Sequence, residues 1–222
     1  MNIEYENVFC YLGFGGINPN PDTIKLVDEC THEIQDISNP KYTYEIFDIK
    51  RQNEVLFLRG SNIIFSEDDI LHYLKDSSKV ALIAATLGIE IDRRILLYMK
   101  TQPIKGLILD ACASAAIESL FSKADSEVKS IALAQDLYAT FRYGPGYGKF
   151  PLHFQFEILQ ALDAYRKIGL SVTESFLLSP RKSLTAIMGL RQTMPLKGEN
   201  RTKCMSCSAV NCQYRKDESL LE

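Results

Sequence analysis

Twelve residues, Arg142-Tyr-Gly-Pro-Gly-Tyr-Gly-Lys-Phe-Pro-Leu-His153, constrain the fold of this chain more than any other stretch. Proline lacks a backbone donor and fixes φ, while glycine reaches conformations that other residues avoid. We therefore expect a loop here, neither regular helix nor central strand. A loop of this composition brings its backbone close to another group, and the guanidinium at its start suits a carboxylate or a phosphate.

The composition limits the classes of partner. The net charge of −3 over 222 residues gives no electrostatic reason to expect binding to nucleic acid or to an anionic membrane surface. The longest apolar stretch, residues 80–87, is much shorter than the roughly 20 residues that cross a bilayer. The first six residues are polar and acidic, unlike a signal peptide. We expect a cytoplasmic protein that does not bind membranes.

The hydrophobic patterns predict an α+β fold, an antiparallel β-sheet with flanking helices, rather than strict βαβ alternation. Three close strands with short polar connections near the N-terminus suggest an antiparallel meander. Residues 1–196 form the predicted domain, and residues 197–222 form a cysteine-bearing tail. The expected helices are 21–37, 66–74, 89–100, 103–122, 125–137 and 151–168, and the expected strands are 42–49, 54–58, 61–65, 79–86, 138–142, 175–178 and 184–190.

Glu118 is the first candidate for a binding residue. It continues the helix face formed by the apolar and small residues at 104, 107, 108, 111 and 115. A carboxylate on such a face is costly unless it is paired. It either reaches solvent at the edge of the helix or accepts a hydrogen bond from an ammonium or hydroxyl group of a ligand.

Arg142 and the loop that follows it form the second candidate. Arg142 ends a plausible strand and would in the simpler case pair with a surface acid. Gly144, Pro145 and Gly146 favour the functional alternative, because glycines let the backbone approach a ligand. Tyr147 offers a ring face for a cation or a base, or else simply covers the loop.

The six cysteines fall into two groups. Without a secretory signal we expect reduced thiols or metal ligands rather than disulfides. Cys10, Cys30 and Cys112 lie among apolar residues and are predicted to be small buried thiols. The tail carries Cys204, Cys207 and Cys212, whose spacing suggests zinc or an iron–sulfur cluster with a fourth ligand from elsewhere, or else three free thiols.

Several ordered segments together resemble the activation domain, which binds S-adenosylmethionine, of vitamin B12-dependent methionine synthase, in its short stand-alone form. The Arg142-Tyr-Gly-Pro-Gly-Tyr-Gly segment is similar to the Arg…Pro-Gly-Tyr signature of that family. The other similar segments are Val8-Phe-Cys-Tyr-Leu-Gly13, Ala84-Ala-Thr-Leu-Gly88 with Asp92, Leu109 to Glu118, and Leu170 to Gly189. The cysteine tail also resembles one found in stand-alone members.

The resemblance implies a function. In that family the domain holds S-adenosylmethionine over the corrin, an electron arrives, commonly from flavodoxin, and methylation of inactive cob(II)alamin restores methylcobalamin. By resemblance, Arg142 would hold the methionyl carboxylate and residues 144–146 would frame the ligand. Tyr147 would flank the adenosine or sulfonium end, and Glu118 would face polar groups of the ligand. Ala186 and Met188 would lie in the far wall.

The chain departs from the family in ways that bear on its partner. It lacks the Asp-x-His-x-x-Gly motif that would mark a cobalamin module, so we expect it to act in trans on a separate methionine synthase or related corrinoid protein. Met188 stands where the long synthases carry an aromatic residue. Two alternatives remain: the tail makes this a metal-bearing redox activator of a corrinoid protein, or the fold serves as a non-catalytic docking partner.

Overall fold

The computed structural model describes residues 2–14 and 18–194 of the chain. Its centre is a six-stranded sheet in the order β3-β2-β1-β4-β8-β5, in which neighbouring strands are antiparallel. This confirms the predicted fold class and the N-terminal meander. The strands are β1 (Lys41–Gln52), β2 (Val55–Leu58), β3 (Ile64–Phe65), β4 (Lys79–Thr86), β5 (Tyr138–Ala139) and β8 (Ser183–Arg191).

The middle of the sheet is apolar on both faces. All residues of β4 from Val80 to Thr86 are buried, as expected for a strand with helices on either side. β1 pairs with one edge of β4 through residues 41–48, and β8 pairs with the other edge of β4. In β1, Tyr42, Tyr44 and Ile46 pack on one face, whereas Phe47 packs on the other. The alternating residues of β1 therefore lie on opposite faces of the sheet, as the sequence pattern indicates.

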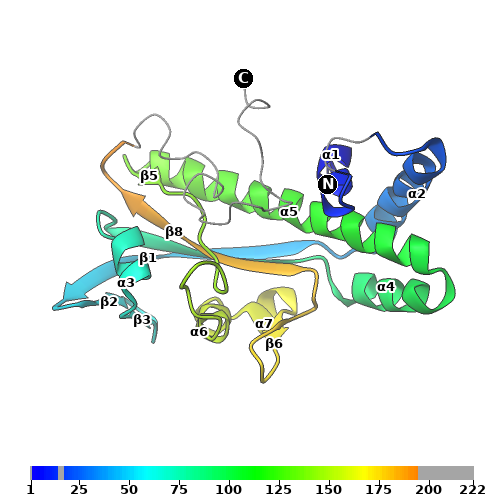
Figure 1. The fold of residues 1–222 in the computed structure, drawn as a ribbon. Helices are drawn as coiled ribbons and strands as arrows, with labels where there is room; N and C mark the ends of the chain where they lie inside the picture. The colour runs from blue at the N-terminus through cyan, green and yellow to red at the C-terminus, as the bar shows by residue number, and fades with distance from the viewer. Residues whose placement is uncertain (1, 15–17, 195–222) are drawn as a thin grey trace.

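Helices cover both faces (Figure 1). On one side α5 (Pro103–Leu133) lies across the sheet, with α1 (Tyr5–Tyr11), α2 (Pro21–Ile37) and α4 (Ile89–Thr101) packed beside it. On the other side lie α3 (Asp68–Tyr73), α6 (Phe154–Ala161) and α7 (Ala164–Ile168). A small hairpin of β6 (Ser171–Val172) and β7 (Leu178–Ser179) follows α7. The long α5 runs from one end of the molecule to the other.

The prediction of two helices between residues 103 and 137 was wrong, because α5 is continuous over 31 residues. Asp125 looks like the start of a new helix, but no proline or glycine interrupts the chain between residues 107 and 133. The buried row also continues without a change of phase through Phe121, Ala124 and Val128. Packing against the sheet therefore carries one helix past the apparent N-terminal signal.

Other boundaries differ from the predictions in the second half of the chain. The helix expected over 151–168 is two helices, because Asp163 adopts a left-handed φ of 49° between them. The strand expected at 175–178 was wrong: Phe176 has a φ of 60°, and the pairing residues are Leu178 and Ser179. The strand expected over 138–142 ends at Ala139. The helix expected over 66–74 begins at Asp68 and ends at Tyr73, and no side chain caps its N-terminus.

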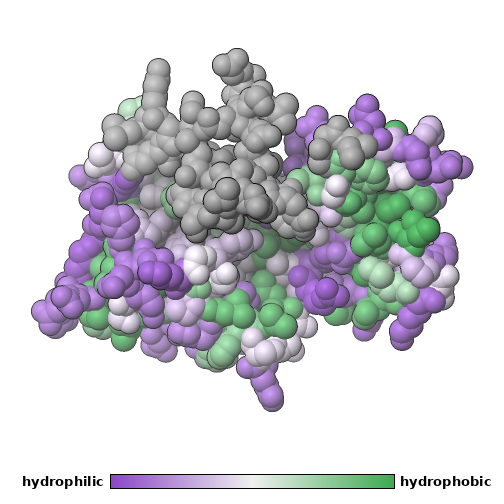
Figure 2. Space-filling view, in the orientation of Figure 1, coloured by the Kyte–Doolittle hydropathy of each residue, from purple (hydrophilic) through white to green (hydrophobic). Residues whose placement is uncertain are grey.

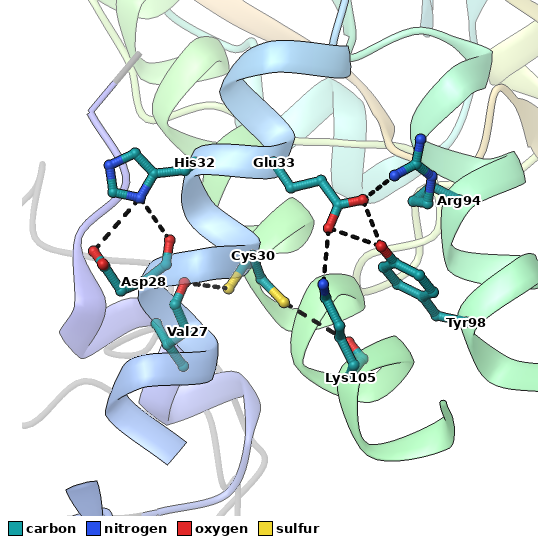
Figure 3. Close-up of polar contacts among 9 residues, drawn as sticks. Val27, Asp28, Cys30, His32, Glu33, Arg94, Tyr98 and Lys105 are labelled. Carbon is teal, nitrogen blue, oxygen red and sulfur yellow. Dashed lines mark hydrogen bonds and ion pairs between the residues drawn. The ribbon is translucent and has the colours of Figure 1, made fainter. Parts of the chain in front are cut away.

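A partly buried charge cluster fixes α2, α4 and α5 to one another (Figure 3). Glu33 of α2 pairs with Arg94 of α4 and, at 3.4 Å, with Lys105 of α5. Tyr98 donates its hydroxyl proton to the same carboxylate at 2.8 Å. Burial alone would raise the pKa of Glu33, but the Tyr98 hydrogen bond and the two cations outweigh it and lower the pKa. We call these four residues the Glu33 cluster.

Apolar side chains also reach the surface near this cluster. Figure 2 shows hydrophobic residues over the end of the molecule where α2, α4 and the start of α5 lie. Leu96, Leu97, Ile104 and Leu107 are each more than half exposed there. Within the described residues, no helix is long and apolar enough to cross a membrane.

Candidate functional site

The segment that precedes Arg142 is held in place by a partly buried tyrosine of α3, Tyr73. The Tyr73 hydroxyl donates to the carbonyl oxygen of Phe141 and lies 2.6 Å from the Thr140 hydroxyl. It also lies 3.2 Å from the carbonyl oxygen of Ile187 in β8. Burial raises the pKa of Tyr73, so the hydroxyl stays protonated and remains a donor. Tyr73 thereby fixes the chain just before Arg142 against β8.

Arg142 meets two acids of α5. Its guanidinium pairs with Glu118, a pair that the sequence analysis did not predict, and lies 3.4 Å from Asp125. The guanidinium carbon also lies 5.1 Å from the centre of the Phe121 ring. The exposed fractions of the Arg142, Glu118 and Asp125 side chains are 20%, 30% and 12%. The three charges are therefore partly desolvated but still reach solvent. Partial desolvation lowers the effective dielectric and would strengthen the interaction of these charges with a charged ligand.

The loop after Arg142 is a pair of tight turns against β8. A Cβ on Gly144 would lie 2.9 Å from the carbonyl oxygen of Thr185, so a side chain is excluded there. Gly146 has a φ of 89° and donates its N–H to the carbonyl oxygen of Phe150 at 2.8 Å. Gly144 and Pro145 are buried, whereas Gly146 and Tyr147 are exposed. The expectation that this segment forms an irregular loop is confirmed.

Aromatic packing anchors the base of the loop. The Tyr143 ring lies 5.2 Å from the rings of both Tyr73 and Phe150, measured between centroids. Phe150 in turn contacts the rings of Phe65 and Phe154. Tyr143 and Phe150 pack with the core on the α6 side of the sheet, whereas Arg142 points to α5. The exposed turn at residues 146–149 is therefore carried on a rigid base.

Two tyrosines lie near the Arg142–Glu118 pair. Tyr147 is half exposed, and its partial burial raises its pKa, with a further contribution from the charge of Glu118 that Arg142 opposes. Burial and the charge of Glu118 raise the pKa of Tyr11 to about 12, and Tyr147 also contributes. Both phenols are therefore neutral at physiological pH. Tyr11 ends α1, which packs on α5, so α1 supplies a further aromatic side chain to this region.

Three residues of this region were missed by the sequence reasoning: Tyr11, Tyr73 and Asp125. Asp125 follows Glu118 by two helical turns and so lies on the same face of α5. A prediction of one continuous helix would have shown this spacing. Tyr11 lies inside the Val8–Gly13 segment already singled out. Nothing in the local sequence points to Tyr73, because its contacts are with residues far along the chain.

The structure places Ala186 and Met188 in β8, on the face that packs against α5. Both side chains belong to the core on that side, with exposed fractions of 3% and 0%. Their contact with a ligand stays a prediction. Glu118, Arg142 and the Gly144–Tyr147 loop converge, and their roles toward a ligand also stay predictions.

The Thr-Leu-Gly…Asp segment has a clear structural use at the other end of β8. Asp92 accepts a hydrogen bond at 2.6 Å from the backbone N–H of Arg181. The next residue, Lys182, lies 3.0 Å from the carboxylate of Asp110 and donates to the Ser114 hydroxyl at 2.9 Å. These contacts tie the start of β8 to α4 and α5. They fix the strand that the Gly-Pro loop packs against.

The prediction of buried thiols is confirmed for Cys30 and Cys112 but not for Cys10. Cys30 of α2 and Cys112 of α5 are buried, and each lies 3.9 Å from a carbonyl oxygen of the other helix. Burial raises the pKa of Cys30 to about 12 and of Cys112 to about 11, so both are unreactive thiols. Cys10 is half-buried rather than buried. Cys204, Cys207 and Cys212 lie outside the described residues, and among residues 2–14 and 18–194 no group of three or more His, Cys, Asp or Glu is placed to hold a metal.

The sheet, the long α5 and the Arg142 loop together define an α+β protein with the fold of a methionine synthase reactivation domain. The solved structure described as "Crystal Structure of the MetH Reactivation Domain bound to AdoHcy" matches with a TM-score of 0.63 and 12% sequence identity, over 89% of this chain and 76% of that one. Residues 104–194 match the model of the family "Vitamin B12 dependent methionine synthase, activation domain". The resemblance to the activation domain is thereby confirmed, whereas the stand-alone form stays a prediction. No curated protein matches the chain.

Proposed function

We propose that this chain binds S-adenosylmethionine at the Arg142 loop and supports the reactivation of a cobalamin-dependent methionine synthase in trans. One observation carries the proposal: Arg142 and Glu118, from the Gly-Pro loop and α5, form an ion pair at a partly exposed position. A guanidinium beside a carboxylate is complementary to an α-amino acid, whose carboxylate and ammonium have the reverse charges. The family match over residues 104–194 includes both residues.

The charges of the region favour a cationic ligand. Arg142 contributes one positive charge, and Glu118 and Asp125 contribute two negative charges, so the three sum to −1. S-adenosylmethionine carries a sulfonium in addition to its amino-acid charges, for a net +1. S-adenosylhomocysteine, the ligand in the matching solved structure, has no sulfonium and is neutral overall. The proposed site therefore prefers the methyl donor over the demethylated product.

The neutral rings of Tyr11 and Tyr147 support the same preference. An aromatic face attracts a cation more strongly than a neutral thioether. Both phenols are uncharged at physiological pH, as an ordinary tyrosine is, and their raised pKa values extend this to higher pH, so they do not compete with Glu118 for Arg142. In the proposed complex, Arg142 holds the carboxylate, Glu118 accepts from the ammonium, and residues 144–146 frame the ligand with backbone groups.

The chain would supply binding and orientation rather than the reactive centre. Bound S-adenosylmethionine would supply the methyl group, and the cobalamin would belong to the partner. The rigid base of the loop, through Tyr73, Tyr143 and Phe150, suits this task, because a methyl donor must be held in one orientation toward a group on another protein.

A reconstitution assay tests the proposal. We would oxidise a cobalamin-dependent methionine synthase that lacks its own activation domain, and then add S-adenosylmethionine, a reductant and this chain. We expect methionine formation to recover only when both the chain and S-adenosylmethionine are present. Arg142→Ala should abolish the recovery, whereas Arg94→Ala, in the Glu33 cluster, should retain it. No recovery with a chain that binds S-adenosylmethionine in isolation would contradict action in trans.

A further inference from the structure

One long strand of the sheet has an edge that no other strand covers. β1 pairs with β4 over residues 41–48, but its opposite edge pairs with β2 only over residues 49–52. Figure 1 shows β2 and β3 at one end of β1, with the rest of β1 extending beyond them. Within the described part of the chain, no strand lies against this edge between Lys41 and Phe47. A long open edge is a template for another strand.

Two hydrogen bonds establish which backbone groups point outward. The N–H of Ile49 donates to Ser78, on the β4 side, whereas the carbonyl oxygen of Asp48 accepts from Arg59, on the β2 side. Because successive residues of a strand point their backbone groups to opposite edges, even-numbered residues of β1 face away from β4. The N–H and C=O groups of Tyr42, Tyr44 and Ile46 therefore face the open edge. No backbone partner for these groups occurs among residues 2–14 and 18–194.

A groove accompanies this edge on the α5 side. A cavity of about 480 Å³ lies between β1 and α5, lined by Tyr44, Lys123, Ser126, Glu127, Ser130 and Ile131. The side chains of Tyr42, Tyr44 and Ile46 point to this same face of the sheet. A strand added at the edge would place its own side chains for this face next to the groove. The groove thus offers room for aromatic side chains beside the open backbone groups.

We propose that a second copy of this chain occupies the edge, so that two β1 strands pair antiparallel about a two-fold axis through Tyr44. Tyr44 then faces Tyr44 of the second copy, and Tyr42 faces Ile46 on either side. This register uses all three outward-facing residues of each chain in three hydrogen-bonded pairs. The side chains that face α5 stay on that face in both copies. The proposal does not depend on the function of the Arg142 loop.

The charged residues of β1 favour this partner and this register. Lys41 and Glu45 are both exposed and lie on the same face of the strand. In the proposed pairing, Lys41 of each chain is the diagonal neighbour of Glu45 of the other, which gives two opposite-charge contacts by symmetry against one diagonal contact between the two Glu45 side chains. Glu45 also lies 3.8 Å from Lys167 of α7 in its own chain, an exposed pair of small energy.

A shift of the second strand by one residue would reverse its faces, and a shift that sets Ile46 opposite Tyr44 would place Glu45 directly against Glu45. The opposite shift, with Tyr42 opposite Tyr44, would set Lys41 directly against Glu45 but would put Pro40, which has no N–H, opposite Ile46. Faces and hydrogen bonds therefore select the proposed register, and its charge contacts are favourable on balance.

Sedimentation of the full chain over a concentration series tests the proposal. We expect a monomer–dimer equilibrium, with a species of twice the 25.1 kDa chain mass present by about 0.3 mM. Lys41→Glu should weaken the dimer about tenfold, because both diagonal contacts become repulsive. The double variant Lys41→Glu, Glu45→Lys restores the opposite-charge diagonals but sets a lysine beside Lys167 of the same chain, so it should restore the dimer to about threefold weaker than the natural chain. Circular dichroism should show the same fold for all variants, because both side chains are exposed.

Lys50→Glu is the matched control. Lys50 is an exposed lysine of the same strand but lies where β2 already covers the edge, so its reversal should leave the dimer unchanged. A chain that stays monomeric throughout the series would overturn the proposal. So would a dimer that Lys41→Glu does not weaken, one that Lys50→Glu weakens equally, or one that the charge-swapped double variant does not restore.

Discussion

The Glu33 cluster and the Arg142 site are built from similar parts but differ in their surroundings. In the cluster one carboxylate meets two cations and a tyrosine, all on the helices α2, α4 and α5. In the site one guanidinium meets two carboxylates, and it sits on an irregular loop that packs against an edge of β8. Only 14% of the Glu33 side chain is exposed, against 30% of Glu118. The first arrangement joins helices, whereas the second leaves charges within reach of a ligand.

We expect substitution of Glu118 to lower ligand affinity and substitution of Glu33 to lower stability. Glu118→Gln keeps the shape of the side chain but removes the charge that would meet the ligand ammonium. We expect the affinity for S-adenosylmethionine to fall about thirtyfold, because a charge-assisted hydrogen bond is lost. The melting temperature should change by less than about 3 °C, since the pair is partly exposed. Calorimetric titration and thermal melts measure the two quantities, and unchanged affinity would contradict the role of Glu118.

Glu33→Gln should show the opposite pattern. The substitution leaves Arg94 and Lys105 without their carboxylate, so we expect the free energy of unfolding to fall by about 2 kcal/mol, between the values for exposed and buried pairs. Affinity for S-adenosylmethionine should stay within about threefold of the natural chain. Chemical denaturation gives the first value, and a large loss of affinity would show that the two regions are not separate.

The pH dependence of this variant gives an independent check. The folded chain holds the pKa of Glu33 below its ordinary value of 4.5. The stability that Glu33 contributes is therefore fully present above pH 4.5 and is lost as the pH falls through the lower, folded value. The difference between the natural chain and Glu33→Gln should shrink in that acid range. A constant difference down to the lowest folded pH would contradict an electrostatic role for the cluster.

Tyr73→Phe tests whether the hydrogen bonds that hold the chain before Arg142 contribute to ligand binding. The change removes a buried hydroxyl that binds Thr140 and Phe141, just before Arg142. We expect a loss of about 1 kcal/mol in stability, as for a buried hydrogen bond. Affinity for S-adenosylmethionine should fall about fivefold, because Arg142 becomes less well positioned. Tyr5→Phe, which removes a hydroxyl bonded to exposed Asp28, is the control that should not alter affinity.

The smallest expected effect concerns Tyr11. Tyr11→Leu should reduce the preference for S-adenosylmethionine over S-adenosylhomocysteine about threefold, because a neutral ring near a cation is lost. Tyr11→Phe retains the ring and should keep the preference. Competition titrations with the two ligands measure the ratio. An equal loss of both affinities in Tyr11→Leu would mean that the ring fills space and does not distinguish the charge.

The sequence predicted the sheet and most of its helices because strong periodic signals decide them. The predicted bounds are correct for β4, which is an apolar run. The predicted start is correct for α2, where Asn20 accepts a hydrogen bond from the Thr23 N–H. The break at Asp163 and the short β6–β7 hairpin were missed, because the left-handed residues that shape them are Asp163 and Phe176 rather than glycine. Local propensity does not favour those conformations, so packing must impose them.

The sequence singled out some residues of the candidate site and missed others. Arg142, its loop and Glu118 stood out by residue type and position, and their contact with a ligand stays a prediction. Asp125 was hidden by the false break in α5, and Tyr73 acts through contacts with residues 67 and more positions away. Such contacts depend on the tertiary fold, which a local pattern does not report.

The most direct test of the account is a calorimetric titration of the chain with S-adenosylmethionine, set beside two arginine variants. We expect one ligand per chain, a loss of at least about a hundredfold in affinity in Arg142→Ala, and affinity within about threefold of the natural chain in Arg94→Ala. Arg94 is the matched control because it also pairs with a partly buried glutamate of a helix. No binding by the natural chain, or equal affinity in Arg142→Ala, would contradict the account.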